Sequence, residues 1–306
     1  MKEHAVAFGR DRSLVGVMTE NGTGNLSAKD NITGVLLLTA GLDHHVGPNR
    51  IYVKLARRLA EMGCVVFRFG FSGTGDSGPR RDKLPASQSV IDETRQAMDY
   101  LERLTGVKRF ILIGLCSGAI TTFQVAVADS RVKGAVLVNP PAPNTVQTEL
   151  MREHNYYWRY ALFNFHNWMR LFFLQSDYRS VWKAVSAKIK SWLRPNYARS
   201  VEPPEVVDEI TKSFQSFQER RVRLLIVSSY SESELGEEYI RRVARKEYKS
   251  MKGSGLLSTK VLRGSDHTVR PLAGQEEMLN FISEWMVEEC RFGSEFGSRA
   301  IDGLLT

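Results

Sequence analysis

Cysteine is scarce in this 306-residue chain: there are three, Cys64, Cys116 and Cys290, and they stand far apart. They form no Cys-x-x-Cys pair and no metal-like spacing, which argues against a disulfide framework and against a zinc site. Residues 1–8 lack the apolar core of a secretory signal, so we expect a reducing, cytoplasmic environment. No apolar run approaches the ~18 residues that a membrane-spanning helix needs.

The glycine-rich stretch 70–78 lacks the features of a phosphate-binding loop. No Lys-Ser or Lys-Thr pair follows it, and no helix is expected directly after it. No nucleic-acid motif is visible, and we expect no cofactor. The formal net charge of +8 suits an anionic substrate, an acidic carrier protein or a membrane surface, although a solvated basic surface gives the same number.

What the chain does have is an alternation of strands and helices. Short apolar runs typical of buried strands occur at 33–41, 64–69, 110–113, 132–139, 222–228 and 256–262. Helices are expected at 50–62, with Asn49 as its cap, and at 85–104, 119–128, 235–252 and 275–290. Two antiparallel strands at 4–9 and 14–19 precede them. This rhythm predicts an α/β protein with a mostly parallel central sheet and helices on both faces.

The rhythm breaks between residues 142 and 220, where no strand is evident and aromatic and basic residues are dense. We interpret this stretch as a helical cap inserted over the sheet. The predicted organisation is therefore an α/β core formed by 1–141 and 221–290, a cap at 142–220 and a flexible tail at 291–306.

The stretch around Cys116 has the pattern of a nucleophile elbow. An apolar strand ends at Gly114, Cys116 occupies the tip, and Gly118 opens a helix-compatible run. Such an elbow needs small flanking residues because the helix packs closely against the strand. A buried cysteine beside an ordinary turn would show the same five residues, so the interpretation depends on the rest of the chain.

A cysteine nucleophile needs a base, and the base needs an orienting acid. His267 follows the last predicted strand, and Glu232 follows the strand before it, with Glu234 in reserve. Nucleophile, acid and histidine thus occur in the order that this type of sheet requires. Asp266 adjoins His267, which suits a residue that shapes the loop better than one that orients the ring.

The loop after the strand at 33–41 is expected to complete the site. The backbone N–H groups of Ser117 and of Leu42, or Asp43 in its place, are the predicted oxyanion donors. His44 and His45 are expected to touch the substrate. Three adjacent residues converge poorly on one ion, so we predict no metal site from Asp43, His44 and His45.

Four stretches carry a resemblance to a known family. Residues 40–50, 67–77, 114–119 and 264–268 make the chain resemble the α/β-hydrolases, and within them the hydrolases associated with exosortase and exopolysaccharide gene clusters. The resemblance covers about residues 33–290. It implies an α/β-hydrolase fold with a helical cap and activity on ester or thioester bonds.

The chain departs from that family at two positions. The family usually carries aspartate after the elbow cysteine, where this chain has Ser117, and aspartate in the acid loop, where it has Glu232. Glutamate also serves as an orienting acid, so the second change affects the assignment of the acid more than the activity. The first leaves the elbow backbone unchanged and bears on the identity of the substrate.

We expect the aromatic stretch of the cap to line an acyl pocket, with Trp158, Phe165 and Trp168 as substrate-contacting residues. Basic residues near it suit a phosphate-bearing carrier such as coenzyme A or an acyl-carrier protein, or a peripheral contact with a membrane. A lid whose aromatics merely pack on the sheet is the simpler alternative. The sequence does not indicate an oligomeric state.

The sequence therefore predicts an acyl hydrolase, of carboxylesterase or thioesterase type, with a Cys116–His267–Glu232 triad and a covalent acyl-enzyme. An acyltransferase with the same triad is an alternative, because water and an acceptor hydroxyl both release an acyl group. A catalytically weak protein that binds an acyl group or a partner, and a redox sensor based on Cys116, are the other classes.

Overall fold

The computed structural model describes residues 1–21, 33–41, 43–142, 203–229 and 234–293. These residues form an eight-stranded sheet in the order β1-β2-β4-β3-β5-β6-β7-β8. The strands are β1 (Lys2–Phe8), β2 (Leu14–Glu20), β3 (Thr33–Leu38), β4 (Val65–Phe69), β5 (Arg109–Leu115), β6 (Val132–Val138), β7 (Arg223–Ser229) and β8 (Leu257–Leu262).

Helices connect and cover the strands. They are α1 (Ile51–Glu61), α2 (Ala86–Thr105), α3 (Ser117–Ala128), α8 (Pro204–Glu219), α9 (Glu234–Val243), α10 (Arg245–Gly253) and α11 (Leu272–Gly293), with short 3-10 helices η1 (Arg10–Arg12) and η3 (Pro48–Arg50). None of the helices in the described part of the chain is long and apolar enough to cross a membrane.

The sheet is antiparallel at one edge and parallel elsewhere. β1 pairs with β2, and β2 with β4, in antiparallel register. From β4 across β3, β5, β6 and β7 to β8 every pairing is parallel. The predicted α/β architecture is therefore confirmed. Because parallel strands end at the same edge, the segments that follow β3, β5, β6, β7 and β8 come together there.

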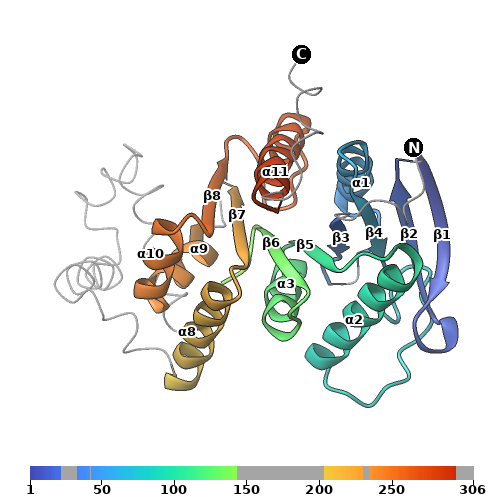
Figure 1. Cartoon of the computed structure of the whole chain (residues 1–306), viewed down its shortest axis with the longest axis horizontal. Helices are drawn as coiled ribbons and strands as arrows, with labels where there is room; N and C mark the ends of the chain where they lie inside the picture. Colours follow the sequence, from blue (N-terminus) through green and yellow to red (C-terminus); the bar gives the residue numbers. More distant parts are fainter. Residues whose placement is uncertain (22–32, 42, 143–202, 230–233, 294–306) are drawn as a thin grey trace, which may run out of the picture.

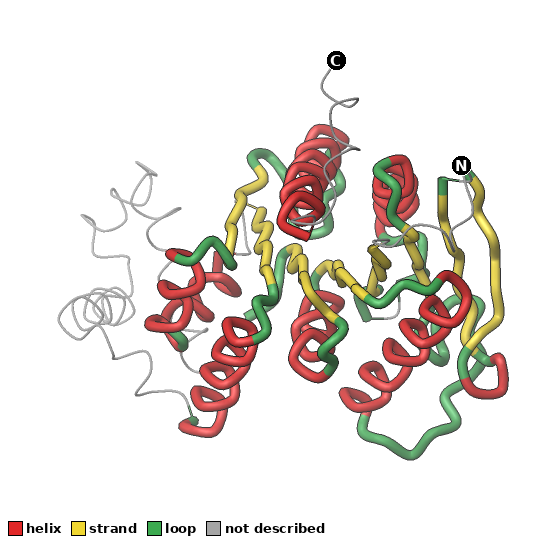
Figure 2. Tube along the Cα trace, viewed as in Figure 1, coloured by secondary structure: helices red, strands yellow, loops and turns green. Residues whose placement is uncertain are grey.

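Helices cover both faces of this sheet, as Figures 1 and 2 show: α1 and α11 lie on one side, and α2, α3 and α8 on the other. Strand β5 shows why. Phe110 and Leu112 belong to the core cluster on the α2–α3–α8 side, whereas Ile111 and Ile113 belong to the cluster on the α1–α11 side. Successive side chains point to opposite faces of a strand, so a strand buried on both faces reads as a continuous apolar run.

Two details differ from the sequence prediction. Asn49 does not cap α1: it has a left-handed φ of 51° inside η3, and Arg50, also left-handed, is the residue that precedes the helix. The helix predicted over 235–252 is two helices, α9 and α10, separated at Ala244. Hydrophobic periodicity did not show this break, because buried apolar residues continue through both helices, although those of α9 lie in a small cluster with Val207 and those of α10 in the large core cluster.

Helix α8 falls within the range 142–220 that we assigned to the cap, yet it covers the sheet. Its Phe214 and Phe217 are fully buried in the larger core cluster. The Phe123 ring of α3 lies edge-on to the Phe217 ring, with 5.2 Å between the ring centroids. In the structure α8 is therefore part of the α/β core, and residues 143–202, which include most of the predicted cap, lie outside the described residues.

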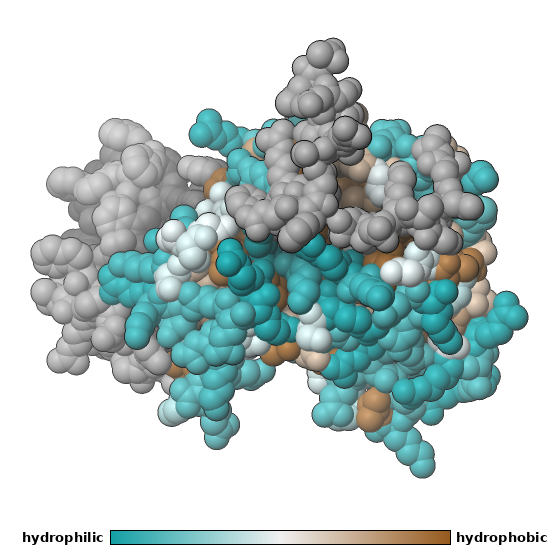
Figure 3. Space-filling view, in the orientation of Figure 1, coloured by the Kyte–Doolittle hydropathy of each residue, from teal (hydrophilic) through white to brown (hydrophobic). Residues whose placement is uncertain are grey.

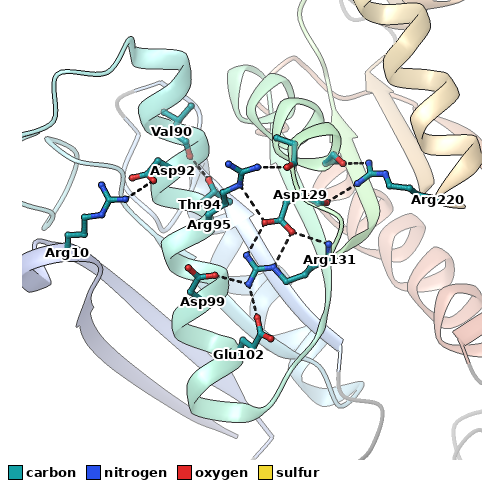
Figure 4. A network of polar contacts seen from close by, with 12 residues as sticks. Arg10, Val90, Asp92, Thr94, Arg95, Asp99, Glu102, Asp129, Arg131 and Arg220 are labelled. Atoms are coloured by element: carbon teal, nitrogen blue, oxygen red, sulfur yellow. Dashed lines mark hydrogen bonds and ion pairs between the residues drawn. The ribbon is translucent and has the colours of Figure 1, made fainter.

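A polar network ties the helices of the α2 side together (Figure 4). Arg131, which directly precedes β6, donates to Asp99 and Glu102 of α2, both at 2.7 Å, and to Asp129 at 2.9 Å. Arg220 follows α8 and donates to the Asp129 carbonyl at 3.0 Å. On the face seen in Figure 3 hydrophilic residues predominate over these helices.

Candidate active site

Cys116 stands on a strained turn between β5 and α3. Its backbone adopts φ 55° and ψ −123°, a conformation that side-chain-bearing residues rarely adopt outside functional sites. The turn depends on two glycines. A Cβ at Gly114 would lie 2.1 Å from the Gly118 carbonyl oxygen, and a Cβ at Gly118 would lie 2.4 Å from the Leu38 carbonyl oxygen. The strand–turn–helix context predicted for the elbow is therefore present.

The structure brings His267 to Cys116. A hydrogen bond joins their side chains, and it is the main reason that the pKa of the Cys116 thiol is lowered. Partial burial opposes this by disfavouring the thiolate, while the charge of a protonated His267 ring favours it. Cys116 is half-buried, so reagents can reach a sulfur that ionises more readily than an ordinary thiol.

The segment after β3 lies against the elbow. The Gly41 N–H donates to the Ser117 Oγ at 2.8 Å, so the serine that departs from the family pattern fastens this segment to the turn that carries Cys116. The Ser117 N–H forms a hydrogen bond with the Cys116 sulfur, which places that donor beside the predicted nucleophile. Asp43 lies close enough for its charge to oppose ionisation of the thiol. Leu42, the other predicted donor, lies outside the described residues.

Tyr52, on α1, is a supporting residue that sequence reasoning missed. Its hydroxyl donates to the Leu38 carbonyl at 2.7 Å and accepts from the Leu115 N–H at 3.0 Å. It is buried, and burial raises the pKa of the phenol well above its usual value. The hydroxyl thus joins the ends of β3 and β5 directly beneath the elbow. Nothing in the helix pattern distinguishes Tyr52 from a residue that only packs in the core.

His44 and His45 lie beside the glycine-rich stretch 70–78. The His44 Nδ1 accepts from the Val46 N–H at 3.3 Å, so the Nε2–H donates to the Asp76 carboxylate at 3.2 Å. The two imidazole rings lie in contact and are tilted by 35° to each other, with 3.9 Å between their centroids. Burial, assisted by the neighbouring His44 and Arg68, lowers the pKa of His45 to about 4. His45 is therefore neutral at pH 7.

Within the described residues, His44, His45 and Asp76 also form a group that could be considered for a metal ion. Their potential ligand atoms lie within 4.8 Å of one another, and this set differs from the Asp43, His44 and His45 that we weighed in the sequence. Arg68 is buried and close enough to His45 to lower its pKa by charge repulsion. A buried cation so near makes the cluster a poor host for a second one, and we assign no metal to it.

Several predicted site residues lie outside the described part of the chain. They are Glu232, the predicted acid, and the cap residues Trp158, Phe165 and Trp168. Glu234, the reserve acid, begins α9, and its side chain is not described. Asp266 accepts from the Arg270 N–H at 2.8 Å and pairs with the Arg270 guanidinium. It therefore holds its own loop, as expected from its position next to His267.

A buried polar group at the ends of β6 and β7 was also missed. The Asn139 amide donates to the Ser229 Oγ at 2.6 Å and to the His267 carbonyl at 2.7 Å. Asn139 and Ser229 are both fully buried. The only signal in the sequence is an asparagine directly after a buried strand, which is as typical of a turn as of a site.

The fold and the site define a class of protein. The family model of the alpha/beta hydrolase fold matches residues 35–278, and the chain belongs to this family. A curated relative, the esterase EstD of Thermotoga maritima, is 29% identical over 101 residues, which cover 33% of this chain and 24% of that protein. The matched stretch thus spans about a quarter of the relative's length.

Solved structures show the same fold at low sequence identity. Est1E of Butyrivibrio proteoclasticus has a TM-score of 0.56 at 12% identity, covering 94% of this chain and 99% of that one. The Pyrococcus furiosus esterase Pf2001 has a TM-score of 0.54 at 15% identity, covering 94% and 91%. XC6422 of Xanthomonas campestris, described as a serine hydrolase without a lid, has a TM-score of 0.52 at 14% identity, covering 93% and 95%.

Proposed function

We propose that this chain is an acyl hydrolase, an esterase or thioesterase, whose nucleophile is Cys116. The observation that carries the proposal is the hydrogen bond between Cys116 and His267 at a strained elbow, together with the lowered pKa of the thiol. The similarity to proteins named as esterases supports the reaction class. Cysteine in place of serine gives a nucleophile that ionises at a lower pH.

In the proposed reaction the His267 ring takes the thiol proton, and the Cys116 sulfur attacks the carbonyl carbon of the ester or thioester. The Ser117 N–H donates to the resulting oxyanion, with the N–H of Leu42 proposed as the second donor, because the Asp43 N–H already donates to the Ala40 carbonyl at 2.9 Å. The carbon–oxygen or carbon–sulfur bond to the leaving group then breaks, and the proton on His267 passes to that group. Water, deprotonated by His267, then attacks the acyl carbon, the bond between that carbon and the Cys116 sulfur breaks, the acid is released, and the proton on His267 returns to the sulfur.

The remaining assignments extend this proposal. Glu232 is proposed to orient His267, and the cap aromatics Trp158, Phe165 and Trp168 to contact the acyl chain. An acceptor hydroxyl in place of water would make the chain an acyltransferase. An anionic carrier as the acyl donor, a cytoplasmic location and a link to exopolysaccharide metabolism rest on the charge, the cysteine content and the family resemblance described above.

The test is intact-mass spectrometry after mixing the protein with short- and long-chain p-nitrophenyl esters and acyl thioesters. Wild type, Cys116→Ala and His267→Ala are compared. We expect an acyl adduct on wild type that is absent from Cys116→Ala and forms more than about tenfold more slowly in His267→Ala. The chain length that reacts fastest measures the pocket, and a long-lived adduct would favour transfer over hydrolysis.

The pH dependence of alkylation by iodoacetamide provides a second readout. Because the pKa of Cys116 is lowered, its alkylation should reach a plateau at a lower pH than that of a free thiol, and His267→Ala should move the midpoint upward. Buried Cys64 serves as the internal control. If Cys116 shows the profile of an ordinary thiol and no ester or thioester acylates it, the proposed nucleophile is wrong and a binding role takes its place.

A further inference from the structure

We propose that Asn139 and Ser229 are positioning residues that set the location of His267 relative to Cys116. This inference rests on the proposed function of the Cys116–His267 pair. The two residues follow or end neighbouring strands, β6 and β7, at the sheet edge where the site lies. Neither was predicted from the sequence.

Hydrogen bonds hold the backbone and the side chain of Asn139 in one conformation. It is fully buried, and its φ of 47° lies in the left-handed region that asparagine tolerates better than most residues. Its N–H donates to the Val227 carbonyl at 2.8 Å, and its Oδ1 accepts from the Ser229 N–H at 2.7 Å. The side-chain amide is therefore held by β7 before it reaches the histidine loop, and its rotamer is determined.

Two consecutive carbonyls of the histidine loop are held by this pair. The Asn139 Nδ2 donates to the His267 carbonyl at 2.7 Å, and the Ser229 Oγ donates to the Asp266 carbonyl at 2.8 Å. The Asp266 carbonyl belongs to the peptide plane before the His267 Cα, and the His267 carbonyl to the plane after it. Because peptide units are planar, fixing both planes fixes φ and ψ of His267 and hence the direction of its Cβ.

The same strand end also holds the nucleophile. The Val138 carbonyl accepts from the Cys116 N–H at 2.9 Å, and Asn139 is the next residue. One short segment therefore bonds to the backbone of Cys116 on one side and to the backbone of His267 on the other. Such a segment sets the separation of nucleophile and base independently of the side chains that react.

The histidine loop needs this support because it contains a strained residue. Val269, two residues after His267, has a φ of 54°, which is unusual for a β-branched side chain. It is fully buried in the core cluster on the α1–α11 side, and its N–H donates to the Asp266 carbonyl at 3.1 Å. Contacts elsewhere must maintain this conformation, and the bonds from Asn139 and Ser229 are suitably placed to do so.

The experiment compares two serines of one strand. Ser229→Ala removes the hydroxyl that donates to the Asp266 carbonyl. That carbonyl still accepts from the Val269 N–H, so the variant should fold. Ser228→Ala is the matched control, because Ser228 is equally buried and its hydroxyl makes no hydrogen bond within the described residues. Asn139→Asp and Asn139→Leu test the amide, since the first replaces its donor with an oxygen and the second removes both polar atoms while keeping the same branching of heavy atoms.

The readouts are the pH profile of Cys116 alkylation, acylation by the best p-nitrophenyl ester and the thermal midpoint. We expect Ser229→Ala to raise the midpoint pH of alkylation and to slow acylation by about tenfold or more, since small misplacements of a catalytic group cost this much. Ser228→Ala should stay within about twofold of wild type on the same scale. Asn139→Asp and Asn139→Leu should show the larger effect.

Two results would overturn the inference. One is wild-type alkylation and acylation in a folded Ser229→Ala and in a folded Asn139 variant. The other is a lowered thermal midpoint with no change in the alkylation profile of the folded protein, which would make the pair structural only. Failure of the proposed function looks different, because wild type itself would then show no acylation and an ordinary thiol profile.

Discussion

The chemistry of the candidate site depends on how individual residues are held. Cys116 is kept on a turn that disfavours a side chain, and its sulfur faces both a histidine ring and a backbone N–H. His45, nearby in the segment after β3, is kept neutral by burial and by the adjacent charge of Arg68. In both residues the surroundings lower the pKa. For Cys116 this favours the thiolate, and for His45 it favours the neutral ring.

His45 should make the protein sensitive to mild acid. Its folded-state pKa of about 4 lies below the unfolded value of 6.5, so the unfolded chain binds the proton first. Above pH 6.5 this difference in proton binding does not reduce the free energy of unfolding. As the pH falls to 4, up to about 3 kcal/mol of the free energy of unfolding should be lost. The measurement is urea unfolding at several pH values between 4 and 7, on wild type and His45→Gln.

The variant supplies the comparison, because acid also protonates carboxylates in both proteins. His45→Gln should show a smaller decrease in the free energy of unfolding between pH 6.5 and 4 than wild type does. If the free energy of unfolding depended on pH identically in the two proteins, the pKa of His45 would be the same in the folded and unfolded states.

At the scale of elements, the site depends on how closely α3 approaches the ends of β3 and β5. Gly114 and Gly118 lack side chains, and a side chain at either position would push the helix away from the strands. Tyr52 of α1 then bonds to β3 and β5 from the other face of the sheet. The elbow is thus built by four elements, α1, α3, β3 and β5, and its geometry should respond to a single added carbon atom.

Gly118→Ala should therefore disturb the site and the fold together. The new Cβ would lie 2.4 Å from the Leu38 carbonyl oxygen, and backbone must move to relieve that contact. We expect a loss of roughly 3 kcal/mol in the free energy of unfolding, with slower alkylation of Cys116 in the folded protein.

Gly253→Ala is the matched control, because Gly253 ends α10 and a Cβ there meets nothing within 4 Å. Its free energy of unfolding should be unchanged or raised by up to about 1 kcal/mol, since alanine is the better helix former. Equal stability of the two alanine variants in urea unfolding would contradict the close approach of α3 to β3.

At the scale of the whole molecule, the parallel sheet orders the site and polar links hold the layers around it. β5 lies between β3 and β6, so segments from distant parts of the sequence meet at its carboxyl end. On the α2 side Arg131 connects α2 with the turn before β6, and Arg220 connects α8 with the end of α3 (Figure 4). Helices α2, α3 and α8, which are far apart in the sequence, are thereby linked to one another.

Arg131→Met should be markedly destabilising. It leaves the Asp129 carboxylate, which is 10% exposed, without the partner that lowers its pKa most strongly. We expect the free energy of unfolding to fall by about 2–3 kcal/mol at pH 7. Urea unfolding provides the measurement, and Arg10→Met is the control because the Arg10–Asp92 pair is exposed and should contribute less than about 1 kcal/mol. Similar losses in the two variants would show that the Arg131 network is no stronger than a surface pair.

Features that depend on nearby residues could be read from the sequence. The turn at Cys116 and the loop with His267 each occupy a short stretch, and each strand or helix follows from a local run of residues. The structure contains the turn, the loop and the alternation of strands and helices. The apolar runs were sufficient because strands buried on both faces must be apolar throughout. Element boundaries were less accurate, as at Ala244, because both α9 and α10 continue the same apolar pattern.

Features that depend on strand order were decided only by the tertiary structure. Asn139 and His267 are 128 residues apart, Tyr52 and Leu115 are 63 apart, and His44 and Asp76 are 32 apart. The assignment of α8 to the core likewise followed from its packing on α3. For Asn139 and Tyr52 the physical reason is the same: a polar group in a buried site is satisfied by whichever strand end lies beside it, and the neighbour in the sheet is set by the fold of the whole chain.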